Sequence, residues 1–419
     1  MPRGAKFPLK TLLLHPSGNT FSRALLRGLV ERDMLGLFVT SIVARKSAPL
    51  VRLLPEPLRR EILRREFEAP AGRVWSRPWR EWGRIFASRL GLKSLTQNET
   101  GWLSWEAVFS DLDRFVARSL ESAVAKFGVS TVYCYEDAAL HVFGAARRLG
   151  LRSAYDLPIA YWETGRRLMQ EERERLPEWD VTMPGTRDSQ RKLDRKTAEL
   201  ELADVVVCPS KFVYDSLPAW CRDGKRCMVA EFGSPPVAAG AGERVRQAGQ
   251  PLRVLFAGSM TQRKGLADVF EAMKILKRND VQLVVFGSPV APMEFYRGQF
   301  PDFIHEPPRP HEEVLRLMET CDVLVLPSIV EGRALVQQEA MSRGLPLIIT
   351  RNTGGEDLVE DGKAGFLVPI RAPGRIAECI AWFADHPEEL RAMQEHACRA
   401  AGRLTWDGYA EKIITGIAP

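Results

Sequence analysis

The chain of 419 residues is 45% hydrophobic and 27% charged, which is close to the average of globular proteins. This length predicts two domains, and the composition excludes a disordered, collagen-like or coiled-coil protein. The formal net charge of +6 is unevenly spread: residues 1–100 carry 19 Lys+Arg and 8 Asp+Glu, whereas the remaining 319 carry 40 and 45. A basic first quarter on an acidic remainder indicates either an anionic partner (a membrane surface, a nucleic acid or an acidic glycan) or ordinary surface charge.

The sequence gives little indication of a membrane-spanning segment, a disulfide or a metal site. No apolar run approaches the ~18 residues that a membrane span needs, and the apolar stretch 12–14 is too short for a signal peptide. The seven cysteines are odd in number and show no CxxC spacing, and none of the six histidines are paired at metal-ligand spacing. We therefore expect a reducing compartment and no metal centre.

In the first half, a strand at 9–14, the loop HPSGN and a helix at 20–33 come first. The further predicted strands are 130–135, 152–157 and 204–208, and the predicted helices are 111–127, 138–149 and 188–202. Segment 52–93 interrupts this order with 11 Arg/Lys against 5 acids, and with Trp75, Trp79 and Trp82. We expect it to be an inserted helical or loop region outside the sheet.

Residues 233–250 are rich in Gly, Pro and Ala without apolar periodicity, and they predict a linker. Short, nearly all-apolar runs then alternate with helical patterns. The strands are expected at 252–258, 281–287, 322–327 and 345–350, and the helices at 265–279, 311–320 and 334–343. This order predicts a parallel sheet with helices on both faces.

Two glutamates follow the predicted strand 322–327. Glu331 lies where the next helix begins, and Glu339 lies about two turns further along it. Parallel sheets bind ligands at the carboxyl ends of their strands, and a carboxylate pair suits a polyhydroxylated ligand. The alternative is that Glu331 caps the helix and Glu339 is merely solvated.

Three other loops follow predicted strands and would meet at the same edge. Arg263 and Lys264 stand in the loop after 252–258, which suits a phosphate or is a solvated basic turn. The turns Gly287-Ser288 and 352–355 are ordinary glycine turns when taken alone. The sequence therefore predicts one cleft bordered by four loops.

These residues resemble a known family. The strings AGSMTQRKG, DVLVLPSIVEGRALVQQEAMSRGLPLIIT and GGEDLVEDGKAGFLVP are similar to the C-terminal domain of retaining glycosyltransferases of family 4, which have the GT-B fold. Glu331 and Glu339 match the family's motif of two glutamates separated by seven residues. The resemblance is strong over 252–369 and weak in the first half, where it covers the loop 15–20 and the stretch 202–217.

The resemblance implies roles for individual residues. Arg263 and Lys264 would bind the donor diphosphate, Glu331 would contact the donor sugar, and Glu339 would accept hydrogen bonds from the ribose. With Glu331, the two cations are the expected catalytic residues. The expected donor-binding residues are Gly18, Gly258, Ser259, Gly287, Ser288, Ser328, Gly332, Arg333, Ala334, Leu335 and Glu339.

The chain also departs from the family pattern. Ser259 stands where many members have Arg, and EGRA replaces the common EGFG, so that Arg333 and Ala334 would alter donor selection. Many members have a His where this chain reads Tyr155-Asp156-Leu157. The acceptor-side candidates are therefore His15, Tyr155 and Asp156, and His141 is the remaining first-half histidine.

The resulting expectation is an α/β protein of GT-B type, with two Rossmann-like domains facing across a cleft. The expected parts are a first, acceptor-side domain (1–232), the linker (233–250), a donor domain (251–400) and a helix crossing back to the first domain (401–419).

The expected reaction is retaining transfer from a nucleotide-diphosphate sugar to a glycan, a lipid-linked or a small-molecule acceptor. It needs no cofactor, metal or nucleic acid. The expected location is cytoplasmic, with possible binding of segment 52–93 to an anionic membrane. The alternatives are a catalytically silent scaffold and, less in keeping with a chain that lacks GxGxxG after its first strand, a nicotinamide enzyme.

Overall fold

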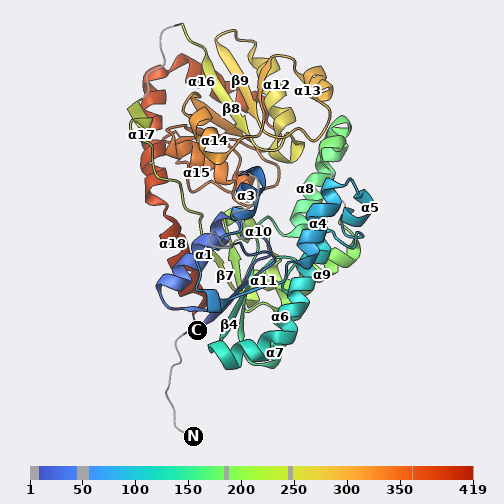
Figure 1. Cartoon of the computed structure of the whole chain (residues 1–419). Coiled ribbons are helices and arrows are strands. Elements are labelled where there is room, and N and C mark those ends of the chain that lie inside the picture. Colours follow the sequence, from blue (N-terminus) through green and yellow to red (C-terminus); the bar gives the residue numbers. More distant parts are fainter. Residues whose placement is uncertain (1–8, 45–55, 184–187, 244–248, 361, 419) are drawn as a thin grey trace.

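The computed structural model describes residues 9–44, 56–183, 188–243, 249–360 and 362–418, and it contains two parallel sheets, one above the other in Figure 1. The first sheet has seven strands in the order β3-β2-β1-β4-β5-β6-β7, and the second has six in the order β10-β9-β8-β11-β12-β13. All named strand pairs are parallel. The predicted fold class is confirmed: the chain is α/β and has two Rossmann-like domains.

The first sheet is covered on both faces. Alternate residues of β1 point to opposite sides, so that Leu12 and Leu14 join one apolar cluster and Leu13 joins another. Helices α6 and α7 cover the first cluster, and α1 covers the second. The strands are Thr11–Leu14 (β1), Leu35–Thr40 (β2), Val74–Ser76 (β3), Thr131–Tyr135 (β4), Arg152–Asp156 (β5), Val205–Cys208 (β6) and Arg226–Val229 (β7). The helices are Thr20–Glu31 (α1), Trp105–Phe127 (α6), Leu140–Arg148 (α7), Gln190–Leu202 (α9), Lys211–Ser216 (α10) and Ala219–Gly224 (α11).

Segment 52–93 does not lie wholly outside the sheet, and this part of the sequence prediction is wrong. Val74–Ser76 forms the edge strand β3, which pairs with Phe38–Thr40 of β2. A three-residue strand at an edge needs no long apolar run, because one side of it lacks a partner strand. The rest of the segment is partly helical, as predicted, with α3 at Glu56–Leu63, α4 at Trp79–Arg89 and the beginning of α5 at Lys93–Thr96.

The second sheet matches its predicted strands closely and has two more, β10 and β13. Its strands are Leu252–Ala257 (β8), Val281–Phe286 (β9), Phe303–Glu306 (β10), Val323–Leu326 (β11), Leu347–Ile349 (β12) and Gly365–Leu367 (β13). Its helices are Leu266–Leu276 (α12), Met293–Gln299 (α13), His311–Met318 (α14), Leu335–Ser342 (α15), Pro373–Asp385 (α16) and Pro387–Arg403 (α17). Both added strands are short and lie at the two edges of the sheet.

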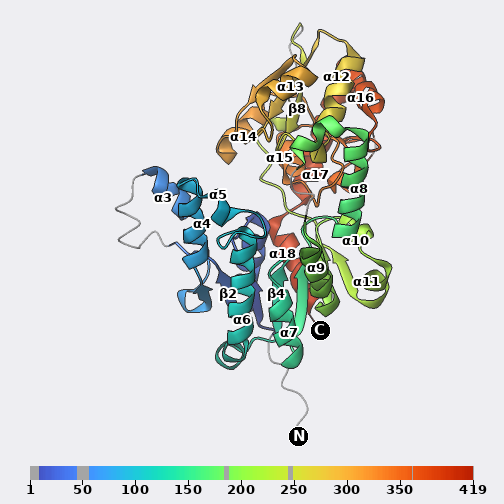
Figure 2. The same ribbon diagram turned by 90° about the vertical axis from the view of Figure 1, so that its right-hand side faces the viewer.

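Two segments cross between the domains. Helix α18, Trp406–Ile417, returns to the first domain, where Tyr409 and Ile413 join the apolar cluster of α1 (Figure 1). This crossing is confirmed as predicted. In the other direction, α8 (Trp162–Arg175) and the 3-10 turn Pro177–Thr182 leave the first sheet and pack into the second core (Figure 2). The ring of Trp179 lies 5.0 Å from that of Phe295, although residue 179 falls within the predicted first domain.

Among the described residues, no helix combines the length and the apolar character that crossing a membrane requires.

Candidate functional site

Two glycine turns lie side by side at the carboxyl ends of β8 and β9. Gly258 and Gly287 have φ angles of 144° and 148°, which side chains rarely allow. A Cβ atom on Gly287 would lie 1.9 Å from the Gly258 carbonyl oxygen, and one on Gly258 would lie 2.7 Å from Cδ of Lys264. Glycine at both positions therefore lets the two loops and the lysine stem pack together.

The two cations of the first loop meet Glu331. Lys264 Nζ lies 2.8 Å from Oε2 of Glu331, and Arg263 Nη1 lies 3.2 Å from Oε1. Arg263 Nη1 also donates to the Val330 carbonyl at 2.9 Å. Burial by itself would raise the pKa of Glu331, but Lys264 and Arg263 outweigh it and hold the pKa at about 2. Glu331 is therefore ionised at neutral pH.

The charges of this group do not cancel. Two cations share one carboxylate, next to the first turn of α12, where backbone N–H groups favour an anion. An entering diphosphate would meet one uncompensated positive charge. It would also compete with Glu331 for both side chains.

The segment after Glu331 touches the first domain. A Cβ atom on Gly332 would lie 1.7 Å from the carbonyl oxygen of Pro158, which follows β5. Ser210, at the start of α10, donates its hydroxyl to the Gly332 carbonyl at 2.6 Å. The two domains therefore meet directly at the glutamate motif. The sequence did not single out Pro158 or Ser210, although Ser210 lies in the stretch 202–217 that resembles the family.

The residues that follow Gly332 face different surroundings. Arg333 has a fully buried side chain and donates to both carboxylate oxygens of Asp357, at 2.6 and 2.8 Å. Its guanidinium is thus engaged away from the two cations. Ala334 precedes α15, and Leu335 packs against the apolar cluster of the first domain. Ser328 is buried, and its Oγ has no partner among the described residues.

Glu339 lies apart from the group formed by Glu331, Arg263 and Lys264. The imidazole of His311, at the start of α14, lies beside Glu339, with Nδ1 3.6 Å from Oε1. Burial raises the pKa of Glu339, and His311 offsets part of this shift. The sequence did not indicate His311, because it stands on a different helix, 28 positions before Glu339. Ser259 is partly buried beside Gly258, and Ser288 is exposed after Gly287.

In the first domain, His15 is a buried, uncharged residue. Its Nδ1 accepts the backbone N–H of Gly18 at 2.7 Å and that of Ser17 at 3.3 Å. Burial, together with Arg23, lowers its pKa to about 3. Gly18 has a φ of 63°, and a Cβ atom there would lie 2.2 Å from the ring of Phe67. The histidine therefore shapes the glycine loop, and Phe67 packs against it.

Tyr155 and Asp156 lie at the end of β5. The Tyr155 hydroxyl donates to Oε2 of Glu199 at 3.0 Å, beneath the surface. Asp156 is also buried, and burial raises its pKa to about 7, although the neighbouring Tyr133 hydroxyl opposes the shift. Asp156 is thus the one of the three acceptor-side candidates that titrates near neutral pH.

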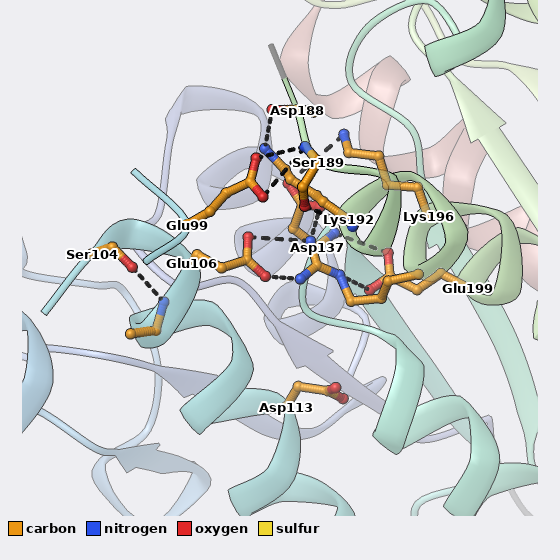
Figure 3. Close-up of polar contacts among 12 residues, drawn as sticks. Glu99, Ser104, Glu106, Asp113, Asp137, Asp188, Ser189, Lys192, Lys196 and Glu199 are labelled. Carbon is orange, nitrogen blue, oxygen red and sulfur yellow. Dashed lines mark hydrogen bonds and ion pairs between the residues drawn. The ribbon is translucent and has the colours of Figure 1, made fainter. Parts of the chain in front are cut away.

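A polar network that the sequence did not predict lies beside these residues (Figure 3). Arg195 contacts the carboxylates of Glu106, Asp137 and Glu199, and thereby joins α6, α9 and the end of β4. The backbone N–H groups of Asp137 and Ala139 also donate to Glu199, whose pKa burial raises to about 8. The side chains come from distant parts of the chain, so no sequence pattern indicated the network.

A hollow of about 740 Å³ opens above this network. Its wall contains the exposed Trp102 and the ring of His141, whose Nδ1 lies 2.6 Å from Oδ2 of the buried Asp113. Cations and carboxylates alternate around it, which suits a polyhydroxylated ligand. Among the described residues, no group of three His, Cys, Asp or Glu side chains is arranged to hold a metal ion.

Sequence comparison finds a family and relatives that match part of the chain. Residues 243–399 match the family model described as Glycosyl transferases group 1. The chain is 33% identical over 107 residues to D-inositol 3-phosphate glycosyltransferase of Corynebacterium urealyticum, covering 26% of this chain and 25% of the relative. It is 32% identical over 157 residues to the putative colanic acid biosynthesis glycosyltransferase WcaL of Salmonella typhimurium, covering 34% and 39%. The matches thus span well under half the length of these curated relatives.

Solved structures match the whole fold. Sucrose-phosphate synthase of Thermosynechococcus elongatus superposes with a TM-score of 0.65 and 17% identity, over 97% of this chain and 98% of that one. Anabaena HepE in complex with UDP superposes with a TM-score of 0.60 and 15% identity, over 97% and 99%. The chain as a whole has the GT-B fold, and its residues 243–399 carry the sequence features of glycosyl transferases group 1.

Proposed function

We propose that the protein is a glycosyltransferase that takes a sugar from a nucleotide-diphosphate donor bound in the second domain. The observation that carries this proposal is the meeting of Arg263, Lys264 and Glu331 at the carboxyl ends of β8 and β11, within the region that matches the family model. Such a group provides an anion site beside an ionised carboxylate, as transfer from a diphosphate requires.

The geometry suggests how the donor would be held. The diphosphate would replace Glu331 as the partner of Lys264 and Arg263, and the freed carboxylate would accept hydrogen bonds from sugar hydroxyls. Because Glu331 stays ionised at neutral pH, it acts here as an acceptor of hydrogen bonds and not as an acid. As the leaving diphosphate gains charge, the two cations stabilise it by several kcal/mol.

The finer assignments are parts of the same proposal. Glu339 would hold the ribose, and Gly258, Gly287 and Ser288 would border the nucleotide. We propose transfer with retention, the outcome described for trehalose-6-phosphate synthase, a solved neighbour with a TM-score of 0.58 and 10% identity. The acceptor, a glycan, a lipid-linked or a small molecule, would enter from the first domain, and the enzyme would be cytoplasmic, at a membrane face.

A binding screen followed by product analysis tests this function. HepE is described in complex with UDP-glucose, so that nucleotide sugar is the first to examine by thermal shift, followed by other UDP- and GDP-linked hexoses. We expect one donor to raise the melting temperature and to yield a free or transferred sugar, whose anomer proton NMR identifies at early times. Binding without any turnover, also in the presence of glycan and lipid-linked acceptors, would instead indicate a silent scaffold.

A further inference from the structure

The exposed apolar side chains are concentrated in one part of the first domain. Of the thirteen large hydrophobic side chains exposed among the described residues, seven fall between residues 79 and 105. Leu90 is 72% exposed, Trp102 59% and Phe86 56%. We call this surface the apolar edge, and its members are Trp79, Phe86, Leu90, Leu92, Leu95, Trp102 and Trp105.

Helical spacing and ring contacts place several of these side chains on one surface. Trp79, Phe86 and Leu90 follow one another at helical spacing along α4 and its end, with Trp82 packed against Phe86 at 6.1 Å. The Trp79 ring lies 5.4 Å from that of Trp102, which precedes α6. Figure 2 shows α4 and α5 beside α3 on the left of the first domain, at its end toward the second domain.

The apolar edge also carries positive charge. Arg84 stacks on Trp105, with its guanidinium carbon 3.8 Å from the ring centroid, and Arg80 lies 4.5 Å from that of Trp79. Arg89 and Lys93 are exposed and have no ion-pair partner in the part of the chain that the structure describes. Glu81, the carboxylate of α4, is buried and lies within ion-pair distance of Arg65 and Arg84, and Asp111 lies 3.7 Å from Arg80, so that Arg89 and Lys93 supply the unpaired charge.

This combination matches an anionic lipid surface better than a protein partner. Exposed apolar patches mark interaction sites, but protein interfaces deplete Lys at their centre, whereas Trp, Leu, Phe and cations together favour the headgroup region. The surface also differs from the one that the sequence suggested. Trp75 points into the first domain, where it packs against Phe115 and Phe127, and Trp102 and Trp105 lie beyond segment 52–93.

We propose that the apolar edge docks reversibly onto an anionic membrane. Arg80 and Trp102 also line the hollow above Arg195, so docking would bring this hollow to the lipid surface. The acceptor would then be the polar head of a membrane lipid, a conclusion that rests on the proposed function. Docking itself does not depend on transferase activity.

Vesicle co-sedimentation of the full chain tests the proposal. We expect binding to phosphatidylcholine vesicles that contain about 30% phosphatidylglycerol, little binding to phosphatidylcholine alone, and a severalfold loss at high salt. The double variant Phe86→Ser/Leu90→Ser should bind at least about tenfold more weakly, because two large apolar side chains no longer enter the headgroup region. Arg89→Glu/Lys93→Glu should lose the preference for anionic vesicles.

The control is Ile275→Ser, which removes a half-exposed apolar side chain from α12 in the other domain and should bind vesicles like the wild type. UDP titration of every variant separates the two proposals, because docking variants should keep wild-type nucleotide affinity whether or not docking occurs. Absence of wild-type binding to anionic vesicles, or equal binding by Phe86→Ser/Leu90→Ser, would overturn the proposal. So would a concentration-dependent dimer that this variant abolishes, since the edge would then be a protein interface.

Discussion

At the scale of single residues, ionisable groups behave differently according to what surrounds them. Glu331 is mostly buried yet ionised, because Arg263 and Lys264 flank its carboxylate. Asp156 is buried without a cation and takes up protons near neutral pH. The first arrangement prepares a site for an anion, and the second makes the first domain sensitive to pH.

The loop cations should distinguish the phosphates of a nucleotide. Lys264→Ala and Arg263→Ala should each weaken binding of a nucleoside diphosphate about 10–100-fold, since a charged hydrogen bond contributes about 1.5–3 kcal/mol. Binding of the monophosphate should change much less. Isothermal calorimetry measures both affinities, with Lys274→Ala on the exposed face of α12 as the control. If both loop variants bound the two nucleotides like the wild type, the loop would be a solvated basic turn.

Asp156 should make stability depend on pH. Its folded pKa of about 7 lies above the unfolded value of about 3.9, so folding takes up a proton between these limits. This contribution is fully present below pH ~4 and is lost as the pH rises to about 7. Between pH 5.5 and pH 7, the free energy of unfolding of the wild type should therefore fall by about 2 kcal/mol relative to that of Asp156→Asn, whose amide does not titrate.

Urea unfolding at the two pH values measures this difference, and the exposed Asp223→Asn is its control. A difference between Asp156→Asn and wild type that stays constant with pH would show that Asp156 is ionised throughout this range.

At the scale of elements, the crossing segments connect the two domains. α18 approaches α1 closely at Gly28, where a Cβ atom would lie 2.6 Å from that of Ala410. In the opposite direction, the buried Glu172 of α8 accepts from Gln262 Nε2 at 2.8 Å and contacts Arg371 of the second domain. Each domain thus packs against a helix that the chain extends from the other domain.

Gly28→Val should loosen the first crossing. The added isopropyl group would overfill the contact between α1 and α18, and overpacking costs about 1–3 kcal/mol. We expect a lower thermal midpoint for this variant, measured by circular dichroism. Gly144→Ala is the control, because Gly144 also lies in a helix but a Cβ atom there would meet only the flexible end of Arg148, at 3.9 Å. It should be neutral or up to about 1 kcal/mol more stable. Equal midpoints of Gly28→Val and wild type would contradict the close contact.

At the scale of the whole molecule, the fold class and most of the inner strands were predictable from the sequence, whereas their order within each sheet was not. Buried parallel strands such as Leu252–Ala257 must be apolar on both faces, and this leaves a clear pattern. Leu35–Thr40 has the same pattern and was open to prediction, although no strand was predicted there. The edge strands Val74–Ser76 and Gly365–Leu367 could not be predicted from the sequence, because three residues are too few to show a hydrophobic pattern.

The candidate site was predictable to a similar degree. The sequence could predict that Glu331 and the two cations border the same edge of one sheet, because each of them directly follows a predicted strand. The contacts of Gly332 with Pro158 and of Glu339 with His311 could not be predicted, because they depend on how distant segments fold together. The charged sequence of α8 likewise gives no sign that its end packs into the second core. Contacts of this kind require the structure.

The release of nucleoside diphosphate from a nucleotide sugar tests the central claim most directly. For the donor that binds best, the wild type should release diphosphate, and Glu331→Gln should reduce the rate on the order of 10²-fold. Nucleotide affinity should not fall in this variant, because the diphosphate no longer competes with a carboxylate for Arg263 and Lys264. Glu271→Gln on the surface of α12 is the control and should leave the rate unchanged. Equal rates for Glu331→Gln and wild type, or no release from any UDP- or GDP-linked hexose with glycan and lipid acceptors present, would contradict the account.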